Sequence, residues 1–289
     1  MDDTKGKELG GGGEVPYPPF VFASSYTPSM KNVVITGASR GIGAAIAREL
    51  AGRGDNLVLA ARSREALAEA AAASPNVRVH IVAADVTQRA DVERIRDEAI
   101  RVFGHVDVWI NNAGRGIVRP VLALTDEDVD EMIAINVKSV LYGMQVIAPH
   151  FMERGRGHII NMSSFLARVP VATPRSAYSA AKAALNSLTA NVRVDLHRTH
   201  PGIKVSLIMP GLVATEFARH ARGSTGPMPP PGSSGSPMKP QTPEEVAVVV
   251  ADVIDHPVAE VYTNPTSHDV AARYIADVGL FESEAESRS

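Results

Sequence analysis

Val33-Val-Ile-Thr-Gly37-Ala-Ser-Arg-Gly41-Ile-Gly43 is the stretch of sequence that decides the fold. A short β-branched run ends in three glycines and is followed by the alanine-rich stretch 44–51, which predicts a strand, a tight turn and a helix. Glycines permit the turn and let backbone N–H groups at the helix N-terminus approach a phosphate. The stretch therefore predicts a nucleotide-binding turn.

The same alternation of short apolar runs and helical stretches continues along the chain, without an internal repeat. It is typical of an α/β fold, and we expect a Rossmann-type doubly wound parallel sheet flanked by helices on both faces. The expected strands are 32–36, 57–61, 77–83, 106–110, 158–162 and 205–209, with a final edge strand at 261–263. The expected helices are 44–51, 64–73, 90–103, 126–151, 177–199 and 243–254.

Length and composition limit the classes of protein to consider. The chain has 289 residues, a formal net charge of −3 and 45% hydrophobic content, which suit one globular domain. No basic excess or block of like charge indicates a nucleic-acid partner, and no apolar run reaches the ~18 residues of a membrane span. The absence of cysteine excludes disulfides and thiolate chemistry, and it fits a cytoplasmic protein.

Two segments differ in composition from the rest. Residues 1–29 combine a glycine run with Val15-Pro-Tyr-Pro-Pro19 and read as a flexible extension: an expression remnant, an upstream translated stretch or a loosely docked arm. The domain then spans 30–289. Within it, 221–240 is rich in glycine, serine and proline and predicts a flexible loop. Such a loop is either a substrate lid or a surface insertion.

A chemical motif lies downstream of the glycine turn. Tyr178 and Lys182 are four residues apart, so they share one face of the expected helix. An ammonium group beside a phenol stabilises the phenolate and lowers the phenol's pKa. This pair predicts a proton donor and acceptor for alcohol–carbonyl chemistry. By contrast, His158, His197 and His200 lack the carboxylate spacing of a metal site or triad, so we expect no metal.

Taken together, these motifs resemble the short-chain dehydrogenase/reductase family. They occur in the family's order and cover roughly residues 31–265. The matching elements are Thr36-Gly-Ala-Ser-Arg-Gly-Ile-Gly43, Asn111-Asn-Ala-Gly114, Asn136, Ser163-Ser164, Tyr178-x-x-x-Lys182 and Pro210-Gly211.

The resemblance implies a nicotinamide cofactor on the glycine turn. Where a site that prefers NAD usually carries an acidic residue after the second strand, this chain has Ala61 and then Arg62. Arg40 and Arg62 can clamp a 2′-phosphate, with Ser63 adding a hydroxyl, so we expect NADP(H) to be preferred over NAD(H). Asp85 is expected either to contact the adenine or to cap the next helix. The predicted cofactor-binding residues are Gly37, Ser39, Arg40, Gly41, Ile42, Gly43, Arg62, Ser63, Asp85, Val86, Asn112, Ala113, Gly114, Tyr178, Lys182, Pro210, Gly211, Val213 and Thr215.

The resemblance also assigns catalytic roles. Ser164 would hydrogen-bond the substrate oxygen, Tyr178 would exchange a proton with it, and Lys182 would lower the phenol's pKa and bind the nicotinamide ribose. Asn136 would complete a water-mediated proton relay to the lysine. Ser163 has the alternative reading of a cap, and the stretch from Ser164 to Tyr178 is one residue longer than in many family members. The predicted substrate-contacting residues are Phe165, Leu166, Val169, Leu212 and Phe217.

These inferences predict an NADP(H)-dependent oxidoreductase that interconverts a ketone or aldehyde and an alcohol. Two alternatives stay open: a 3-oxoacyl carrier reductase of the same family, for which Arg115 and Arg119 would form a basic docking patch, and a non-catalytic nucleotide-binding or scaffold protein. The expected partner is a small carbonyl or alcohol substrate, with no nucleic acid and no membrane. The family further suggests a homodimer or homotetramer assembled through the helices at 126–151 and 177–199.

Overall fold

The fold was analysed in a computed structural model, which describes residues 30–217, 219–223 and 239–286. The predicted extension 1–29 and most of the predicted loop 221–240 lie outside the described residues. Everything below refers to the described part of the chain.

Seven parallel strands form the centre of the fold. The strands lie in the order β3-β2-β1-β4-β5-β6-β7, which confirms the predicted doubly wound sheet. β1 is the pivot, because it pairs with β2 on one side and β4 on the other. Ligand sites in such sheets lie at the carboxyl ends of the strands, beside this reversal of strand order. The strands are β1 (Asn32–Thr36), β2 (Asn56–Ala61), β3 (Val79–Ala83), β4 (Val108–Asn111), β5 (Gly157–Met162), β6 (Ile203–Met209) and β7 (Glu260–Tyr262).

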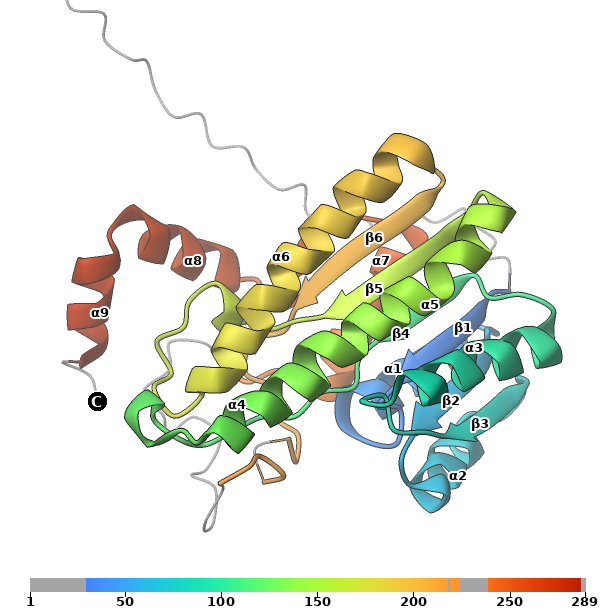
Figure 1. The fold of residues 1–289 in the computed structure, drawn as a ribbon, viewed down its shortest axis with the longest axis horizontal. Helices are drawn as coiled ribbons and strands as arrows, with labels where there is room; N and C mark the ends of the chain where they lie inside the picture. Colours follow the sequence, from blue (N-terminus) through green and yellow to red (C-terminus); the bar gives the residue numbers. More distant parts are fainter. Residues whose placement is uncertain (1–29, 218, 224–238, 287–289) are drawn as a thin grey trace, which may run out of the picture.

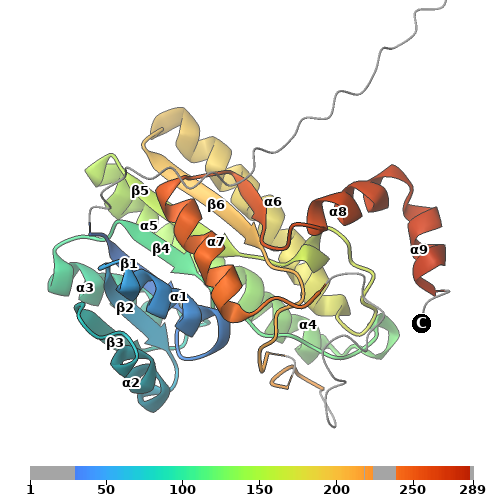
Figure 2. The ribbon, with the colours of Figure 1, turned by 180° about the vertical axis from the view of Figure 1, so that it is seen from behind.

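Helices cover both faces of the sheet (Figures 1 and 2). On one face, apolar side chains of α3 (Arg89–Phe103), α5 (Ser139–Arg154) and α6 (Ser176–Thr199) pack on the strands around Trp109 and Phe151. On the other face, α1 (Gly41–Gly52), α2 (Arg64–Ala72) and α7 (Pro243–Asp255) form the second core. Each face buries a continuous apolar layer, which is the dominant stabilising term of such a fold.

The long helix predicted at 126–151 is interrupted. It consists of α4 (Asp126–Ile133), the π-helical turn η2 (Ala134–Lys138) and α5. In that turn the Ser139 N–H donates to Ala134 O, five residues back instead of four. Side chains beyond the turn are therefore rotated relative to an uninterrupted helix, and such turns often mark functional sites.

Several boundaries differ from the prediction: β6 begins two residues earlier and α1 three residues earlier than expected, whereas β3 and β4 each begin two residues later. Val106 was expected to begin the fourth strand, but its N–H donates to the His150 side chain and its C=O accepts from Arg154. The strand consequently begins at Val108. Near β3, Asn76 has a φ of 73°, and the chain becomes regular strand only at Val79.

Four elements were not predicted. The short 3₁₀ turns η1 (Val121–Ala123) and η3 (Phe165–Ala167) lie in connections. At the C-terminus, α8 (Ser267–Ala276) and α9 (Val278–Glu286) extend away from the sheet (Figure 1). The base of this arm is held by a separate apolar cluster in which Ala271 packs with Phe165 and Val169.

By length and composition alone, the helical run Asp126–Arg154 is long and apolar enough to cross a membrane. Half of its most apolar window is buried inside the protein, as in a core helix.

Candidate active site

A cleft of about 1940 Å³ runs along the carboxyl ends of the strands. Every predicted cofactor-binding residue and all five predicted substrate-contacting residues line it, together with Ser164, Tyr178 and Lys182. Asn136 alone among the predicted residues lies behind the cleft wall. We call the part formed by 37–43, 61–63 and 84–87 the cofactor end. The part around 164–178, 212–217, 219–220 and the C-terminal arm is the substrate end.

The glycine turn has no room for a side chain at Gly37 or Gly43. Gly37 and Gly41 have φ angles of +66° and +54°, which favour glycine. A Cβ added to Gly37 would lie 2.8 Å from the Cα of Ala113, and one added to Gly43 only 2.3 Å from Gly37 O. Helix α1 begins at Gly41 with no side-chain cap and no acidic residue in its first turn. Its first N–H groups and its dipole therefore suit an anionic phosphate.

The Asn-Asn-Ala-Gly segment is fastened to the end of β1. Thr36 Oγ1 accepts from the N–H groups of Asn112 and Ala113, at 3.0 and 3.2 Å. The Asn112 side chain donates to Thr36 O at 2.9 Å. Asn111 turns the other way, into a buried chain of amides, and donates to Asn161 Oδ1 at 2.8 Å. These contacts fix the floor of the cleft between β1 and β4.

Arg62 directly follows β2, is exposed and lines the cofactor end of the cleft. Ser63 lines the cleft too, but its hydroxyl already caps α2: it accepts from the Ala66 N–H at 3.2 Å and donates to Glu65 at 3.0 Å. Asp85 uses Oδ1 to accept from both the N–H and the hydroxyl of Thr87, at 2.9 and 2.8 Å. Asp85 thus closes a local turn with Thr87 and does not cap α3, whose N-cap residue is Gln88 and which has no side-chain cap.

Arg40 reaches across the cleft. Its Nη1 lies 2.8 Å from Nε2 of His220, on the segment that follows β6. The other ring nitrogen, Nδ1, is 2.9 Å from Glu216 O, which favours a proton on Nδ1 and leaves Nε2 to accept from the guanidinium. Sequence reasoning did not identify His220, because its contact with Arg40 joins residues 180 positions apart.

The two serines after β5 face different environments. Ser163 Oγ donates to Asn186 Oδ1 at 2.5 Å, inside the interface with α6. The Ser164 hydroxyl instead lies on the side of Tyr178, where it acts to lower the pKa of the phenol, and it accepts from the Leu166 N–H at 3.2 Å. The structure therefore places Ser164, and not Ser163, on the side of the phenol.

Tyr178 and Lys182 differ electrostatically from the sequence-based expectation. Burial raises the pKa of Tyr178, while the Ser164 hydroxyl and the charge of Arg175 act in the opposite direction. Burial lowers the pKa of Lys182 to about 7. The lysine Nζ donates to Met162 O at 2.8 Å and lies 5.9 Å from the phenol ring centroid. The expected lowering of the phenol's pKa by Lys182 is thus not found here, because desolvation dominates for both groups.

Asn136 lies in the π-helical turn, and its side chain is fully buried. Its Nδ2 donates to Arg115 O at 2.9 Å and to Met132 O at 3.2 Å, while Oδ1 accepts from the Arg115 N–H at 3.3 Å. A Cβ added to Gly114 would lie 3.0 Å from Asn136 Oδ1 and 3.6 Å from Lys182 Nζ. Asn136 and Lys182 thus approach the same point of the backbone, where the resemblance placed a relay.

The substrate end is lined by side chains from separate segments. Phe217 packs edge-on against Tyr178, with ring centroids 5.6 Å apart. Phe165 and Val169 are buried at the base of the C-terminal arm, whereas Leu212 and Phe217 are about 40% exposed. Sequence reasoning missed the contribution of the arm; the apolar spacing within Ser267–Ala276 is the signal that could have revealed it. The cleft-lining residues of the arm are Val270, Arg273, Phe281, Glu284 and Ala285.

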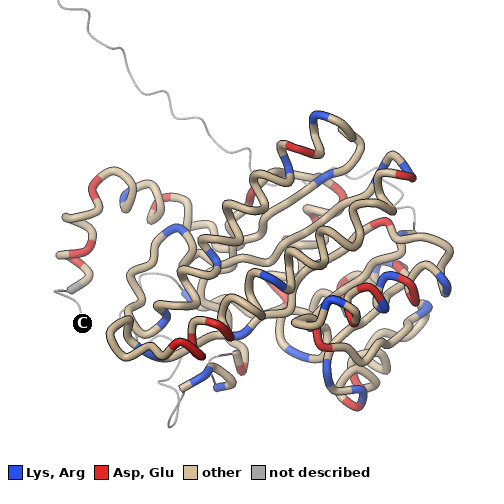
Figure 3. The backbone as a smooth tube through the Cα atoms, in the orientation of Figure 1, with Lys and Arg blue, Asp and Glu red and all other residues tan. Residues whose placement is uncertain are grey.

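An ionic cluster borders the substrate end, where acidic residues gather on α4 (Figure 3). Arg119 contacts the fully buried Asp128 at 2.8 Å, and Arg222 contacts both Asp128 and Glu131. Arg115 pairs with Glu131 as well. Both arginines proposed as a carrier-docking patch are therefore already neutralised by carboxylates.

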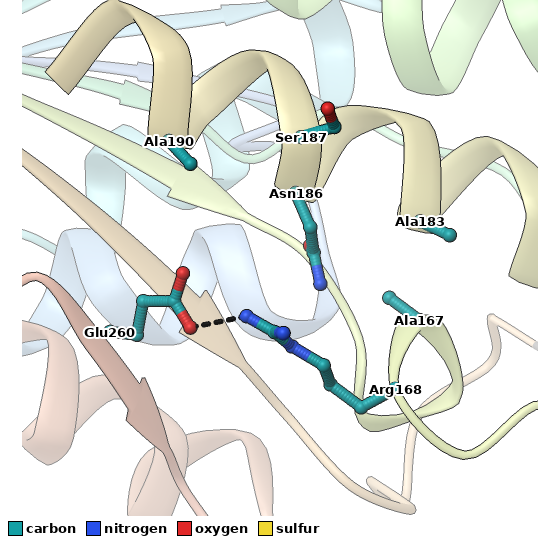
Figure 4. Close-up of a pocket in the computed structure, with 7 residues that line it drawn as sticks. All are labelled: Ala167, Arg168, Ala183, Asn186, Ser187, Ala190 and Glu260. Atoms are coloured by element: carbon teal, nitrogen blue, oxygen red, sulfur yellow. Dashed lines mark hydrogen bonds and ion pairs between the residues drawn. The ribbon is translucent and has the colours of Figure 1, made fainter. Parts of the chain in front are cut away.

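Two other features lie away from the cleft. Arg168 pairs with Glu260 at 2.5 Å beside a separate pocket of about 260 Å³ on α6 (Figure 4). His158 is buried, lies 2.9 Å from Ser206 Oγ and has its pKa lowered to about 3 by burial. No group of three or more His, Asp or Glu side chains that could hold a metal ion occurs among the described residues.

Comparison with known proteins agrees with this architecture. A model of the short chain dehydrogenase family matches residues 31–225. An uncharacterized oxidoreductase of Staphylococcus epidermidis is 37% identical over 185 residues, which cover 64% of this chain and 79% of that protein.

Two solved structures share the fold. An alcohol dehydrogenase of the archaeon Thermococcus sibiricus, complexed with 5-hydroxy-NADP, aligns with a TM-score of 0.70 and 29% identity over 81% of this chain and 96% of that one. A short chain dehydrogenase/reductase of Burkholderia phymatum, in complex with NAD, aligns with a TM-score of 0.75 and 26% identity over 89% and 96%.

The chain belongs to the short-chain dehydrogenase family and is an oxidoreductase. Both of these neighbours hold a nicotinamide nucleotide, 5-hydroxy-NADP in the first and NAD in the second.

Proposed function

We propose that this protein interconverts a ketone or aldehyde and an alcohol, with NADP(H) as cofactor. The observation that carries the proposal is the meeting of Ser164 and Tyr178 in one cleft with the glycine turn. When bound, the nicotinamide cofactor supplies or accepts the hydride. The glycine turn, the floor at Asn112 and the segment from Pro210 to Thr215 are the parts of this chain that would hold it.

The chain's own residues provide the proton chemistry. Ser164 holds the substrate oxygen against the phenol, and Tyr178 donates its proton to that oxygen in the reducing direction. Burial favours the protonated phenol, which suits a proton donor. Lys182, with a pKa of about 7, and Asn136 lie behind Tyr178 and resupply the proton.

The preference for NADP(H) rests on charge at the cofactor end. Arg40 and Arg62 line it, and Ala61 stands where an acidic residue would repel a phosphate. Among the described residues, no carboxylate lies within ion-pair distance of either guanidinium in the contacts we observe. Ser63, occupied as a helix cap, contributes less than its position in the sequence suggested.

The test is a panel of ketones and aldehydes assayed with NADPH and NADH. Tyr178→Phe is expected to lower kcat by about 10²–10⁴-fold, since it removes the general acid. NADPH binding, followed by its fluorescence, should be unchanged. Tyr142→Phe is the matched control, because that ring lies outside the cleft under Arg89. Retention of most turnover by Tyr178→Phe would contradict the proposed mechanism.

We further infer that two or four copies assemble through α4, α5 and α6. Large apolar side chains are exposed on all three helices: Val129 (42%), Met152 (37%) and Val194 (60%). Exposed apolar side chains on neighbouring elements are typical of contact surfaces. Light scattering after size exclusion should give a multiple of the 30.6 kDa chain mass, and a monomer would overturn this inference.

A further inference from the structure

Arg175 lies at the substrate end of the cleft, directly before α6. It is three residues from Tyr178, and its charge acts on the phenol. Burial lowers the pKa of Arg175, which shows that its guanidinium is partly removed from water. A cation in such a position is costly unless an anion compensates it.

The other arginines of the substrate end have such partners. Arg115 pairs with Glu131, Arg219 with Glu216 at 3.4 Å, and Arg273 with Glu284 at 2.9 Å. Arg175 has no ion pair with a carboxylate of the described residues, and the one group whose charge acts on it is Tyr178. Among the substrate-end arginines described here, Arg175 is therefore the one whose positive charge a bound anion could compensate.

The position of Arg175 is fixed by its surroundings. Nη1 donates to Ile117 O at 3.3 Å, and the backbone C=O accepts from the Ser179 hydroxyl at 3.0 Å. A Cβ added to Gly116 would lie 3.1 Å from Arg175 Nη1 and 2.8 Å from Phe217 Cε1. Phe217 in turn contacts Tyr178. The guanidinium, an aromatic wall and the acid/base phenol therefore lie around the same small volume.

We propose that Arg175 binds a carboxylate of the substrate, so that the preferred substrate is an oxo acid whose anionic group lies a few bonds from its carbonyl. This rests on the proposed function, because it concerns the same cleft. A guanidinium carries five N–H donors, so the one bond to Ile117 leaves several for a carboxylate. Such charge-assisted hydrogen bonds are strong and directional. Phe217 would cover the apolar carbons between the two polar ends.

The inference is tested with pairs of acids and neutral esters that share one carbonyl. Suitable probes are benzoylformate with its methyl ester and levulinate with its methyl ester, assayed with NADPH. The wild-type enzyme should show a kcat/KM at least about 10-fold higher for the acid of one pair. Arg175→Gln should reduce that acid's kcat/KM by about 10–100-fold, mainly through KM, and change the ester's by less than about 3-fold.

Two variants accompany this experiment. Arg168→Gln is the matched control: Arg168 lies beside the separate pocket and pairs with Glu260, so it should leave the acid-to-ester ratio unchanged. Arg175→Lys keeps the charge but loses the planar fork, and it should retain part of the preference for the acid. Neither Arg175 variant removes a helix cap, because the Arg175 side chain caps no N–H of α6.

The outcomes separate the two proposals. Reduction of esters and simple ketones without preference for acids would overturn the role of Arg175 and leave the proposed function standing. An equal loss of kcat for acid and ester in Arg175→Gln, with a shifted pH profile, would also overturn it, because Arg175 would then act through Tyr178 alone. Absence of any carbonyl reduction by the wild-type enzyme would contradict the proposed function instead.

Discussion

At the cofactor end of the cleft the backbone sets the shape, whereas at the substrate end side chains from several distant segments do. The glycine turn leaves no room for a single added methyl group at Gly43. Tyr178 instead meets Phe217, and the C-terminal arm meets Phe165 and Val169, across gaps of tens of residues. A frame made of backbone cannot be altered by exchanging side chains, whereas a surface made of side chains from loops can. The two ends should therefore respond differently to substitution.

The largest expected effect is at Lys182, where removing a functional side chain should stabilise the protein. Its pKa is about 7 in the folded chain and 10.5 when unfolded, so the unfolded state binds more protons between these values. The free energy of unfolding should consequently rise as pH increases from about 7 to 10.5. Lys182→Met should stabilise the protein at pH 7 by about 2–4 kcal/mol, less the lost bond to Met162, and flatten this pH dependence.

Urea denaturation of both proteins, without added nucleotide, at several values of pH across that window measures this effect. Lys204→Met is the control, since Lys204 is exposed and its Nζ contacts only Pro201 O at 2.9 Å. If Lys182→Met were destabilising at pH 7, the desolvation assigned to this lysine would be wrong.

At the cofactor end, a substitution is expected to lower the free energy of unfolding. Gly43→Ala would place a methyl group 2.3 Å from Gly37 O and 2.6 Å from the Asn112 side chain. Overpacking of this kind costs about 1–3 kcal/mol and should also weaken NADPH binding. Thermal unfolding and fluorescence titration measure the two losses.

The control for Gly43→Ala comes from the same helix. Gly52→Ala, where nothing lies within 4 Å, should be neutral or stabilising by up to about 1 kcal/mol. Equal losses of stability in Gly43→Ala and Gly52→Ala would contradict the close packing described at Gly43.

Cofactor preference should respond to charge at the cofactor end alone. Arg62→Gln is expected to lower the ratio of kcat/KM for NADPH over NADH by about 10–100-fold, because a charge-assisted bond to the 2′-phosphate is lost. Arg64→Gln, two residues on and outside the cleft, should leave the ratio unchanged. Equal rates of the wild-type enzyme with both cofactors would contradict the predicted preference.

The smallest effect is expected at Phe217. Its edge-on contact with Tyr178 is worth about 0.5–1.5 kcal/mol, so Phe217→Ala should raise KM by up to about 10-fold and leave the NADPH affinity unaltered. Leu122→Ala, at a fully exposed position, is the control. A loss of NADPH affinity in Phe217→Ala would mean that the two ends are not independent.

The same contrast explains what the sequence could predict. The strands and the glycine turn depend on local patterns, so their positions follow from the printed residues. The contact of Arg40 with His220 and the placement of Arg175 depend on chain segments that only folding brings together. The pKa of Tyr178 was misjudged because burial cannot be read from the spacing of two residues.

The π-helical turn at Ala134–Lys138 makes the length of this helix, and not only its composition, a requirement of the site. Deleting one residue there would restore regular α-helical spacing and leave α5 in nearly its present rotational position, because the π turn takes up one extra residue, but the widened turn that holds Asn136 would be lost. Asn136 could then no longer hold both the N–H and the C=O of Arg115 while α5 keeps its contact with the sheet. An in-frame codon deletion in this short stretch should therefore be as harmful as replacing the asparagine itself, although no functional side chain would be lost.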